Sequence, residues 1–141
     1  MDAMQQLLER EAIAREMHRY CRAIDAKDRA GYLGVFHTDA VANYTRGDVV
    51  GHDALGAFFD KFIGKLMAAT QHQVSNFEID FVSDDEASSI SYVTAWHRFA
   101  EARPDYVVHG QYHDRWRRGA DGWRMSERRI HVLGEVSQPR D

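Results

Sequence analysis

Residues that cross-link or interrupt a chain are scarce in this sequence of 141 residues. Cys21 is the one cysteine, so an internal disulfide is excluded and a reducing compartment fits. Two prolines are present, Pro104 and Pro139, and there are no repeats, low-complexity tracts or linkers. Because the length falls within the usual range of one domain, we expect a single domain over residues 1–141.

Long apolar runs and an excess of one charge are also absent. No segment approaches the roughly 20 apolar residues that cross a bilayer as a helix, and residues 1–13 are acidic and amphipathic, unlike a signal peptide. The formal charge is −4 with both signs interspersed, which argues against nucleic acid or an anionic membrane surface as the main partner. We therefore expect a cytoplasmic protein that binds neither nucleic acid nor membranes.

The first half of the sequence has helical periodicity. Residues 4–27 place apolar side chains at steps of three to four residues: Leu7, Ala14, Met17, Cys21 and Ile24. Asp25 continues one edge of this stripe, which puts its carboxylate partly inside. Asp28 is placed to cap a second, short helix that runs through Phe36. A third amphipathic helix is expected over residues 52–67, with these side chains inward: Leu55, Phe58, Phe59, Phe62, Ile63 and Leu66.

The second half alternates in the manner of strands. We expect a hairpin over residues 40–50, then four long strands joined by short polar turns: 71–82, 87–102, 105–118 and 122–133. Helices first and strands afterwards define the α+β class. The expected fold is a cone, in which a curved mixed or antiparallel sheet wraps around three N-terminal helices and leaves a pocket at its mouth. Aromatic residues make up 11% of the chain, enough to line such a pocket.

Asp25 and His72 are the most informative pair. A carboxylate beside an imidazole holds the ring in one tautomer and stabilises its protonated form, which makes the histidine a proton-abstracting base. Strict alternation would place His72 and Phe77 on opposite faces of their strand, because five residues separate them. A β-bulge between Gln73 and Asn76 is therefore predicted, since without it His72 points away from the helices.

Several short motifs, spread over about residues 8–133, resemble the SnoaL-like branch of the nuclear-transport-factor-2-like superfamily. The motifs are Tyr20-x4-Asp25, Phe36-His37-Thr38-Asp39-Ala40, Gly51, Thr70-x-His72-x3-Asn76, Gly110-x-Tyr112-x-Asp114, and Gly122-Trp123-Arg124-Met125 with Arg128. This resemblance implies the cone-shaped fold. The superfamily hosts many unrelated functions, so the fold alone does not imply one.

Within this branch, the pairing of Asp25 with His72 is similar to that of the group formed by scytalone dehydratase, bile-acid 7α-dehydratase and hexachlorocyclohexane dehydrochlorinase. These enzymes eliminate a leaving group after a histidine paired with an aspartate removes a proton, and they need no metal or organic cofactor. The resemblance therefore implies a lyase of the dehydratase type, without cofactors, in which His72 and Asp25 are catalytic.

The same group suggests three further catalytic candidates, each with a plainer alternative. Tyr20 either donates a hydrogen bond to a substrate or packs in the core. His97, in phase with small residues of its strand, either protonates a departing hydroxyl or is a hydrogen-bonded core histidine. Arg128 either faces the pocket and stabilises developing negative charge, or belongs to a surface ladder of charged neighbours on the last strand.

The remaining site predictions concern binding rather than chemistry. Asn76 is expected either to orient a ligand or to serve the bulge. The aromatic side chains expected to line or support the pocket are Tyr44, Phe58, Phe59, Phe62 and Trp96.

A metal site in the main pocket is not expected. His109 and His113 lie four residues apart on one strand, roughly 13 Å at strand rise, which is too far to bind one ion. The sequence contains no HxH, CxxC or HExxH motif. The strand from Ile90 to Ala100 has no Asp or Glu, which weighs against chemistry like that of ketosteroid isomerase or limonene epoxide hydrolase.

The hypothesis that follows is a lyase acting on an apolar small molecule that carries hydroxyl or carbonyl groups. A non-catalytic binding or scaffold domain is the alternative from another class, and a polyketide cyclase or isomerase would use the same pocket. A homodimer or homotrimer is also expected, because an open curved sheet leaves an apolar outer face. The aromatics placed on that face are Tyr92, Trp96, Tyr106, and Tyr112 or Trp116.

Overall fold

The computed structural model describes residues 1–140. Its elements are α1 (Ala3–Asp25), α2 (Arg29–Gly34), β1 (Phe36–Asn43), β2 (Asp48–Val50), α3 (Gly51–Phe59), the π-helix η1 (Asp60–Leu66), β3 (Met67–Phe81), β4 (Glu86–Phe99), β5 (Asp105–Gly119) and β6 (Gly122–Gln138). The predicted helices and long strands are thus present. The third predicted helix changes from α to π geometry after Phe59, and the last strand runs on to Gln138.

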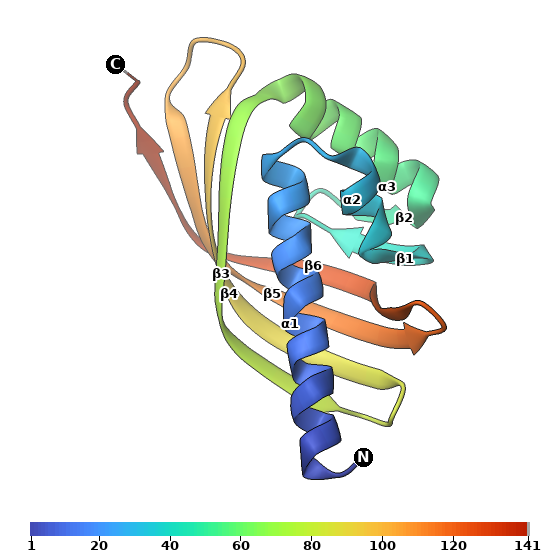
Figure 1. Cartoon of the computed structure of the whole chain (residues 1–141). Helices are drawn as coiled ribbons and strands as arrows, with labels where there is room; N and C mark the ends of the chain where they lie inside the picture. The colour runs from blue at the N-terminus through green and yellow to red at the C-terminus, as the bar shows by residue number, and fades with distance from the viewer. Residues whose placement is uncertain (141) are drawn as a thin grey trace.

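Within the described residues, six strands form one sheet in the order β2-β1-β6-β5-β4-β3. Strands β3 to β6 form an antiparallel meander, whereas β1 runs parallel to β6 and antiparallel to β2. The sheet bends strongly, and α1 runs along its concave side (Figure 1). The predicted α+β cone, a curved mixed sheet around N-terminal helices, is confirmed. No helix in this part of the chain is long and apolar enough to span a membrane.

Helix α1 is positioned by its caps and its apolar stripe. The Asp2 side chain accepts a hydrogen bond from the backbone N–H of Gln5, which satisfies one free donor of the first turn. The side chains buried against the sheet include Ile13, Met17, Tyr20, Cys21 and Ile24. Leu7 of the predicted stripe is 62% exposed and lies outside the core. The helix ends at Asp25, and Lys27 follows with a left-handed φ of 55°, a conformation that commonly terminates helices.

A β-bulge in β3 determines which way His72 points. The register against β4 shifts by one residue between two pairs: Ser75–Tyr92 and Glu78–Ile90. Asn76 lies at the shift with a φ of 55°. The extra residue moves His72 onto the same face as Phe77, which is the concave face. The predicted bulge is therefore present, at the C-terminal end of the segment expected to contain it.

The outer face of the sheet carries fewer aromatic side chains than predicted. Tyr112 and Trp116 are 2% and 1% exposed and belong to the core, and Tyr106 lines the cavity described below. Their placement on the outer face is wrong, because the alternation of β5 turns all three to the concave side. Tyr92 does lie outside, 49% exposed. A homodimer or homotrimer stays a prediction.

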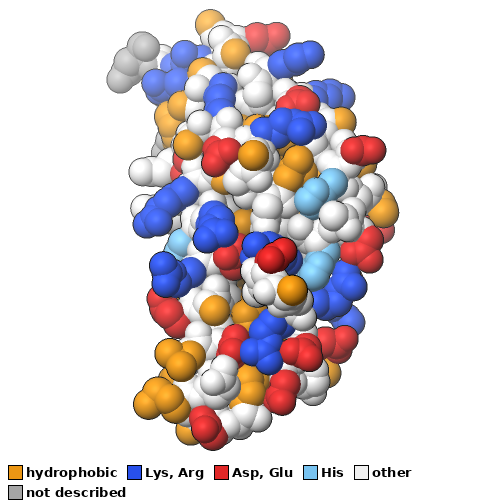
Figure 2. Space-filling view, turned by 45° about the vertical axis from the view of Figure 1, so that its right-hand side comes forward, with side chains coloured by type: hydrophobic (Ala, Val, Ile, Leu, Met, Phe, Trp, Pro, Cys, Tyr) orange, Lys and Arg blue, Asp and Glu red, His pale blue; other side chains and the backbone are white. Residues whose placement is uncertain are grey.

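Glu9 of α1 forms side-chain hydrogen bonds with strands β5 and β6. Its carboxylate accepts hydrogen bonds from Arg118 of β5 and from the Trp123 indole of β6, each at 2.6 Å. Elsewhere the charges are mixed, and Figure 2 shows Lys and Arg side chains interspersed with Asp and Glu over the visible face. This distribution agrees with the alternation of charge in the sequence.

Candidate active site

The end of α1 and the start of β3 bring Asp25 and His72 into contact. Oδ1 of Asp25 lies 2.8 Å from Nδ1 of His72, and Oδ2 accepts the backbone N–H of the same residue at 2.9 Å. The Thr70 hydroxyl also donates to Oδ1, at 2.9 Å. Because a carboxylate only accepts hydrogen bonds, the ring proton sits on Nδ1 and the lone pair on Nε2. The hydrogen bond from Thr70 to Asp25 was not predicted. It could have been, because Thr70 lies two residues before His72 and therefore on the same face of the strand.

His72 borders a cavity of about 420 Å³ on the concave side of the sheet. The His72 side chain is 7% exposed, and its Nε2 makes no hydrogen bond with any residue of the described chain. The buried ring thus presents a free lone pair to a space large enough for a small organic molecule. This arrangement has the geometry that a general base requires.

The cavity contains most of the predicted site residues. Besides His72, its lining includes Tyr20, Tyr44, Phe58, Phe62 and His97. Of the other predicted binding residues, Trp96 alone is in the wrong place. Phe59 does not line the cavity but supports it: it is 3% exposed and packs on Tyr32, a lining residue, at 5.0 Å between ring centroids. Trp96 points to the outer face, because its neighbour on β4, His97, points inward. Asn76 is exposed and lies at the bulge, which is the second of its two predicted roles.

Three tyrosine hydroxyls meet at one wall of the cavity. The Tyr44 hydroxyl lies 2.7 Å from that of Tyr20 and 3.1 Å from that of Tyr32. Burial raises the pKa of all three phenols, so they stay protonated at neutral pH. Three O–H donors share two mutual hydrogen bonds, which leaves one proton free for a ligand. Tyr32 was not predicted; as one more aromatic on a short helix, it had no distinguishing signal.

Arg128 lies behind this wall rather than in it, and both predictions for it are wrong. Its side chain is fully buried and forms two hydrogen bonds with Asp114, at 2.8 and 2.7 Å. Its guanidinium carbon lies 4.1 Å from the Tyr20 ring centre and 3.7 Å from that of Tyr112. The cause is a register shift between β5 and β6 that turns the arginine inward. Burial opposes its charge, but the Asp114 carboxylate holds the pKa of Arg128 well above its ordinary value.

His97 lies beside the dyad. Its ring is 5.7 Å from that of His72, centroid to centroid, and stacks on Tyr106 at 4.2 Å. Burial and the neighbouring His72 lower the pKa of His97 from 6.5 to about 4. At neutral pH the ring is therefore uncharged, so it is not an imidazolium acid. Two adjacent imidazoles are costly to protonate together, which leaves the proton-accepting role to His72.

The depressed pKa of His97 predicts an acid-sensitive stability. Between pH 6.5 and 4 the unfolded chain binds a proton at His97 that the folded protein does not, so the free energy of unfolding falls as pH falls through this window. His97→Asn should reduce the loss between pH 7 and 5 by about 1–2 kcal/mol, measured by urea unfolding. His109→Asn, at an exposed position of the outer face, is the control. Equal losses in wild type and His97→Asn would contradict this assignment.

Two rows of contacting aromatic rings form walls of the cavity. In one, Tyr44 stacks on Phe58 at 4.8 Å, and Phe58 contacts Phe62 at 4.6 Å. In the other, Tyr106 stacks between His97 and Phe99, at 4.2 and 5.3 Å. Flat, rigid walls of this kind suit a planar or cyclic apolar ligand.

Other reactive side chains contribute little here. Burial raises the pKa of the Cys21 thiol to about 11, so it is no nucleophile. No three His, Cys, Asp or Glu side chains among residues 1–140 are grouped so that they could hold a metal ion.

A cone of curved sheet and helices, with a ligand-sized cavity on its concave side, is the fold of the nuclear-transport-factor-2-like superfamily. Residues 5–129 match the family model of the SnoaL-like domain. The chain therefore belongs to the SnoaL-like family, as its motifs predicted. No protein of curated function matches the chain with significance.

Solved structures reproduce this fold over nearly the whole chain. One is a proposed scytalone dehydratase from Novosphingobium aromaticivorans, with 29% identity, a TM-score of 0.90, and coverage of 98% of this chain and 97% of that one. Another is a proposed aromatic ring hydroxylase from the same species, with 26% identity, a TM-score of 0.87 and coverage of 94% of each chain. A hexachlorocyclohexane dehydrochlorinase, LinA type 2, has 16% identity, a TM-score of 0.90, and coverage of 99% and 95%, which shows the shared fold alone.

Proposed function

We propose that this protein is a cofactor-independent lyase that eliminates water from an apolar small molecule with hydroxyl and carbonyl groups. One observation carries the proposal: a buried His72, oriented by Asp25, presents an unpaired Nε2 to the cavity. The similarity to a proposed scytalone dehydratase supports the same type of reaction.

The first step is removal of a proton. Nε2 of His72 takes it from a carbon next to the substrate carbonyl, where the C–H bond is most acidic. The positive charge that develops on the imidazolium lies against the Asp25 carboxylate, 2.8 Å from Nδ1. Thr70 and the backbone N–H of His72 fix that carboxylate, so the pair needs little rearrangement during the reaction.

The second step is departure of the hydroxyl group. The electron pair of the broken C–H bond forms the new C=C bond as the C–O bond breaks. The imidazolium of His72 returns its proton to the departing oxygen, which leaves as water and restores the base. The free proton of the Tyr20, Tyr32 and Tyr44 hydroxyls would hydrogen-bond the carbonyl oxygen as it becomes an enolate.

The direct test is an elimination assay. The protein is incubated with cyclic β-hydroxy ketones in D₂O, and proton NMR follows loss of the α-proton and appearance of the enone. We expect enone formation above the buffer rate for at least one member of the panel. A ligand that exchanges its α-proton without losing water would indicate an isomerase or cyclase instead. Ligands that bind in the cavity yet neither exchange nor react would favour a binding domain.

A further inference from the structure

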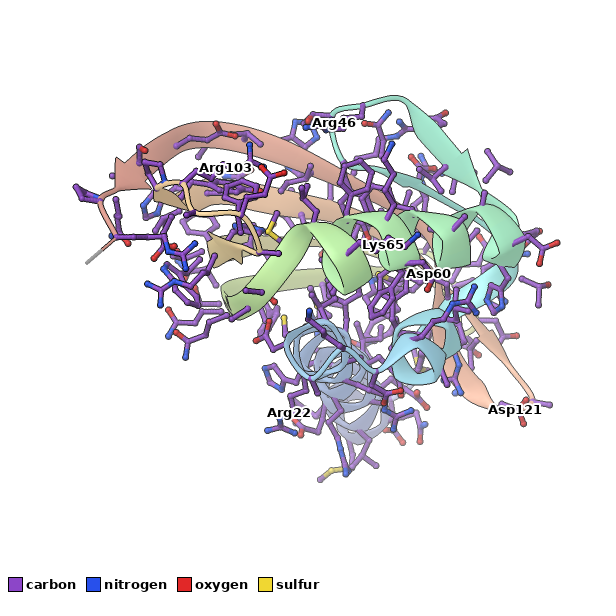
Figure 3. All side chains as sticks on the ribbon, turned by 90° about the horizontal axis from the view of Figure 1, so that it is seen from above. Arg22, Arg46, Asp60, Lys65, Arg103 and Asp121 are labelled. Atoms are coloured by element: carbon purple, nitrogen blue, oxygen red, sulfur yellow. The ribbon has the colours of Figure 1, made fainter. Side chains whose placement is uncertain are left out.

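The cavity has a charged rim that the proposed reaction does not use. Arg46 lies on the loop between β1 and β2, and Arg103 lies on the hairpin between β4 and β5; both side chains line the cavity. Figure 3 looks down on this end of the molecule, with Arg46 and Arg103 on separate loops and Arg22 away on α1.

Each arginine covers the last ring of one aromatic wall. The guanidinium carbon of Arg46 lies 5.2 Å from the Phe62 ring centre, and that of Arg103 lies 3.3 Å from the Phe99 ring centre. Such cation–π contacts orient a guanidinium without using its N–H donors. Neither side chain makes a hydrogen bond or ion pair with the described residues, so the donors of both forks are available.

Glu135 contributes a third charge to the same rim. Burial raises the pKa of Tyr106, the Glu135 carboxylate raises it further, and Arg46 and Arg103 lower it. All three charges therefore act near the hydroxyl of one cavity residue. Glu135 lines the cavity as well, yet it lies beyond ion-pair distance of either arginine. Two cations and one carboxylate leave the rim with a net positive charge.

The rim and the base are separated by a length that a substrate can span. The His97 ring lies 5.7 Å from that of His72. Phe99 follows two residues further along the same strand face, so Arg103 stands on the order of 10 Å from the base. The aromatic wall of His97, Tyr106 and Phe99 runs between these points. A flat molecule with two fused rings has about this length.

We propose that the substrate carries an anionic group, a carboxylate or a similar oxyanion, which Arg46 and Arg103 bind while its reacting carbon lies at His72. The inference rests on the proposed function, because it names the substrate of that site. A guanidinium fork matches a carboxylate in two parallel hydrogen bonds, and two forks would also fix the direction in which an otherwise apolar molecule enters. The positive rim would raise the local concentration of such anions.

A pair of fluorescent probes tests this without a known substrate. Anilinonaphthalene sulfonate and its uncharged parent, phenylnaphthylamine, differ only in the anionic group. Dissociation constants are measured for wild type, the double variant Arg46→Gln/Arg103→Gln, Glu135→Gln and Arg22→Gln. The last removes an exposed arginine outside the cavity.

We expect the double variant to bind the sulfonate about tenfold more weakly, since each partly exposed pair contributes a few-fold, and to bind the parent as wild type does. Glu135→Gln should bind the sulfonate more tightly, and Arg22→Gln should bind both probes like wild type. Equal losses for the two probes, no loss, or no binding of the sulfonate to wild type would overturn the proposal. Adding His72→Gln separates the two hypotheses, because it should lower elimination by about 10²- to 10⁴-fold and leave the difference between the probes intact.

Discussion

Replacing His72 with Gln should lower kcat/KM for elimination by about 10²- to 10⁴-fold, the usual contribution of a positioned general base. Gln retains a polar side chain of similar reach but has no lone pair basic enough to take a proton from carbon. Since removal of the proton belongs to the chemistry and not to substrate binding, the loss should appear in kcat rather than in KM. The measurement is the enone assay under steady-state conditions, with near-ultraviolet circular dichroism to show that the fold is retained.

Asp25→Asn is the companion variant, because the amide preserves the shape of the carboxylate but not its charge. It should also reduce kcat strongly, since the imidazolium loses its counter-charge and Nδ1 loses a fixed acceptor. His109→Gln, an exposed histidine on the outer face, should behave like wild type. If His72→Gln kept a tenth or more of wild-type activity, another residue would have to be the base.

Breaking the ion pair between Arg128 and Asp114 should cause the largest loss of stability. Both side chains are fully buried, so either one left alone is a charge without a partner. Arg128→Met should lower the free energy of unfolding by about 3–5 kcal/mol. For a protein of this size, such a change lowers Tm by about 10 °C. Urea unfolding and thermal melting, both followed by circular dichroism, measure the effect.

Arg129→Met is the matched control on the next residue. Arg129 pairs with Glu127 and Asp48 in partly exposed positions, so its loss should cost less than about 1 kcal/mol. The double variant Arg128→Met/Asp114→Leu should recover part of the stability lost by Arg128→Met, because no buried charge then remains. A similar, small effect of the two single methionine variants would show that the buried pair contributes no more than a surface pair.

The sequence predicted the fold and the dyad because both depend on local periodicity and on motifs. The helical stripe placed Asp25 at an inner edge, and the parity mismatch between His72 and Phe77 required a bulge. The alternation of side chains along β4 could also have excluded Trp96 from the cavity, because the next residue, His97, was predicted to point inward. That error came from treating aromatic character as evidence of lining, without regard to the phase of the strand.

Arg128 could not be placed by the same reasoning. Its direction depends on a register shift between β5 and β6, and its partner lies on another strand. No spacing within one strand reveals which residue will face it across a sheet. The arginines of the rim are similar, because Arg46 and Arg103 lie on loops whose approach is set by the bend of the whole sheet.

The bulge of β3 makes the site depend on a count of residues as well as on their identity. Substitutions along the strand leave the number of residues between His72 and Phe77 unchanged, so their side chains keep the same side of the sheet. Inserting or deleting one residue between His72 and Ser75, with the bulge at Asn76 left in place, would put His72 and Phe77 on opposite faces. The strand could then bury either His72 or the apolar side chains that follow the bulge, such as Phe77, but not both. This strand should therefore tolerate substitutions better than insertions or deletions.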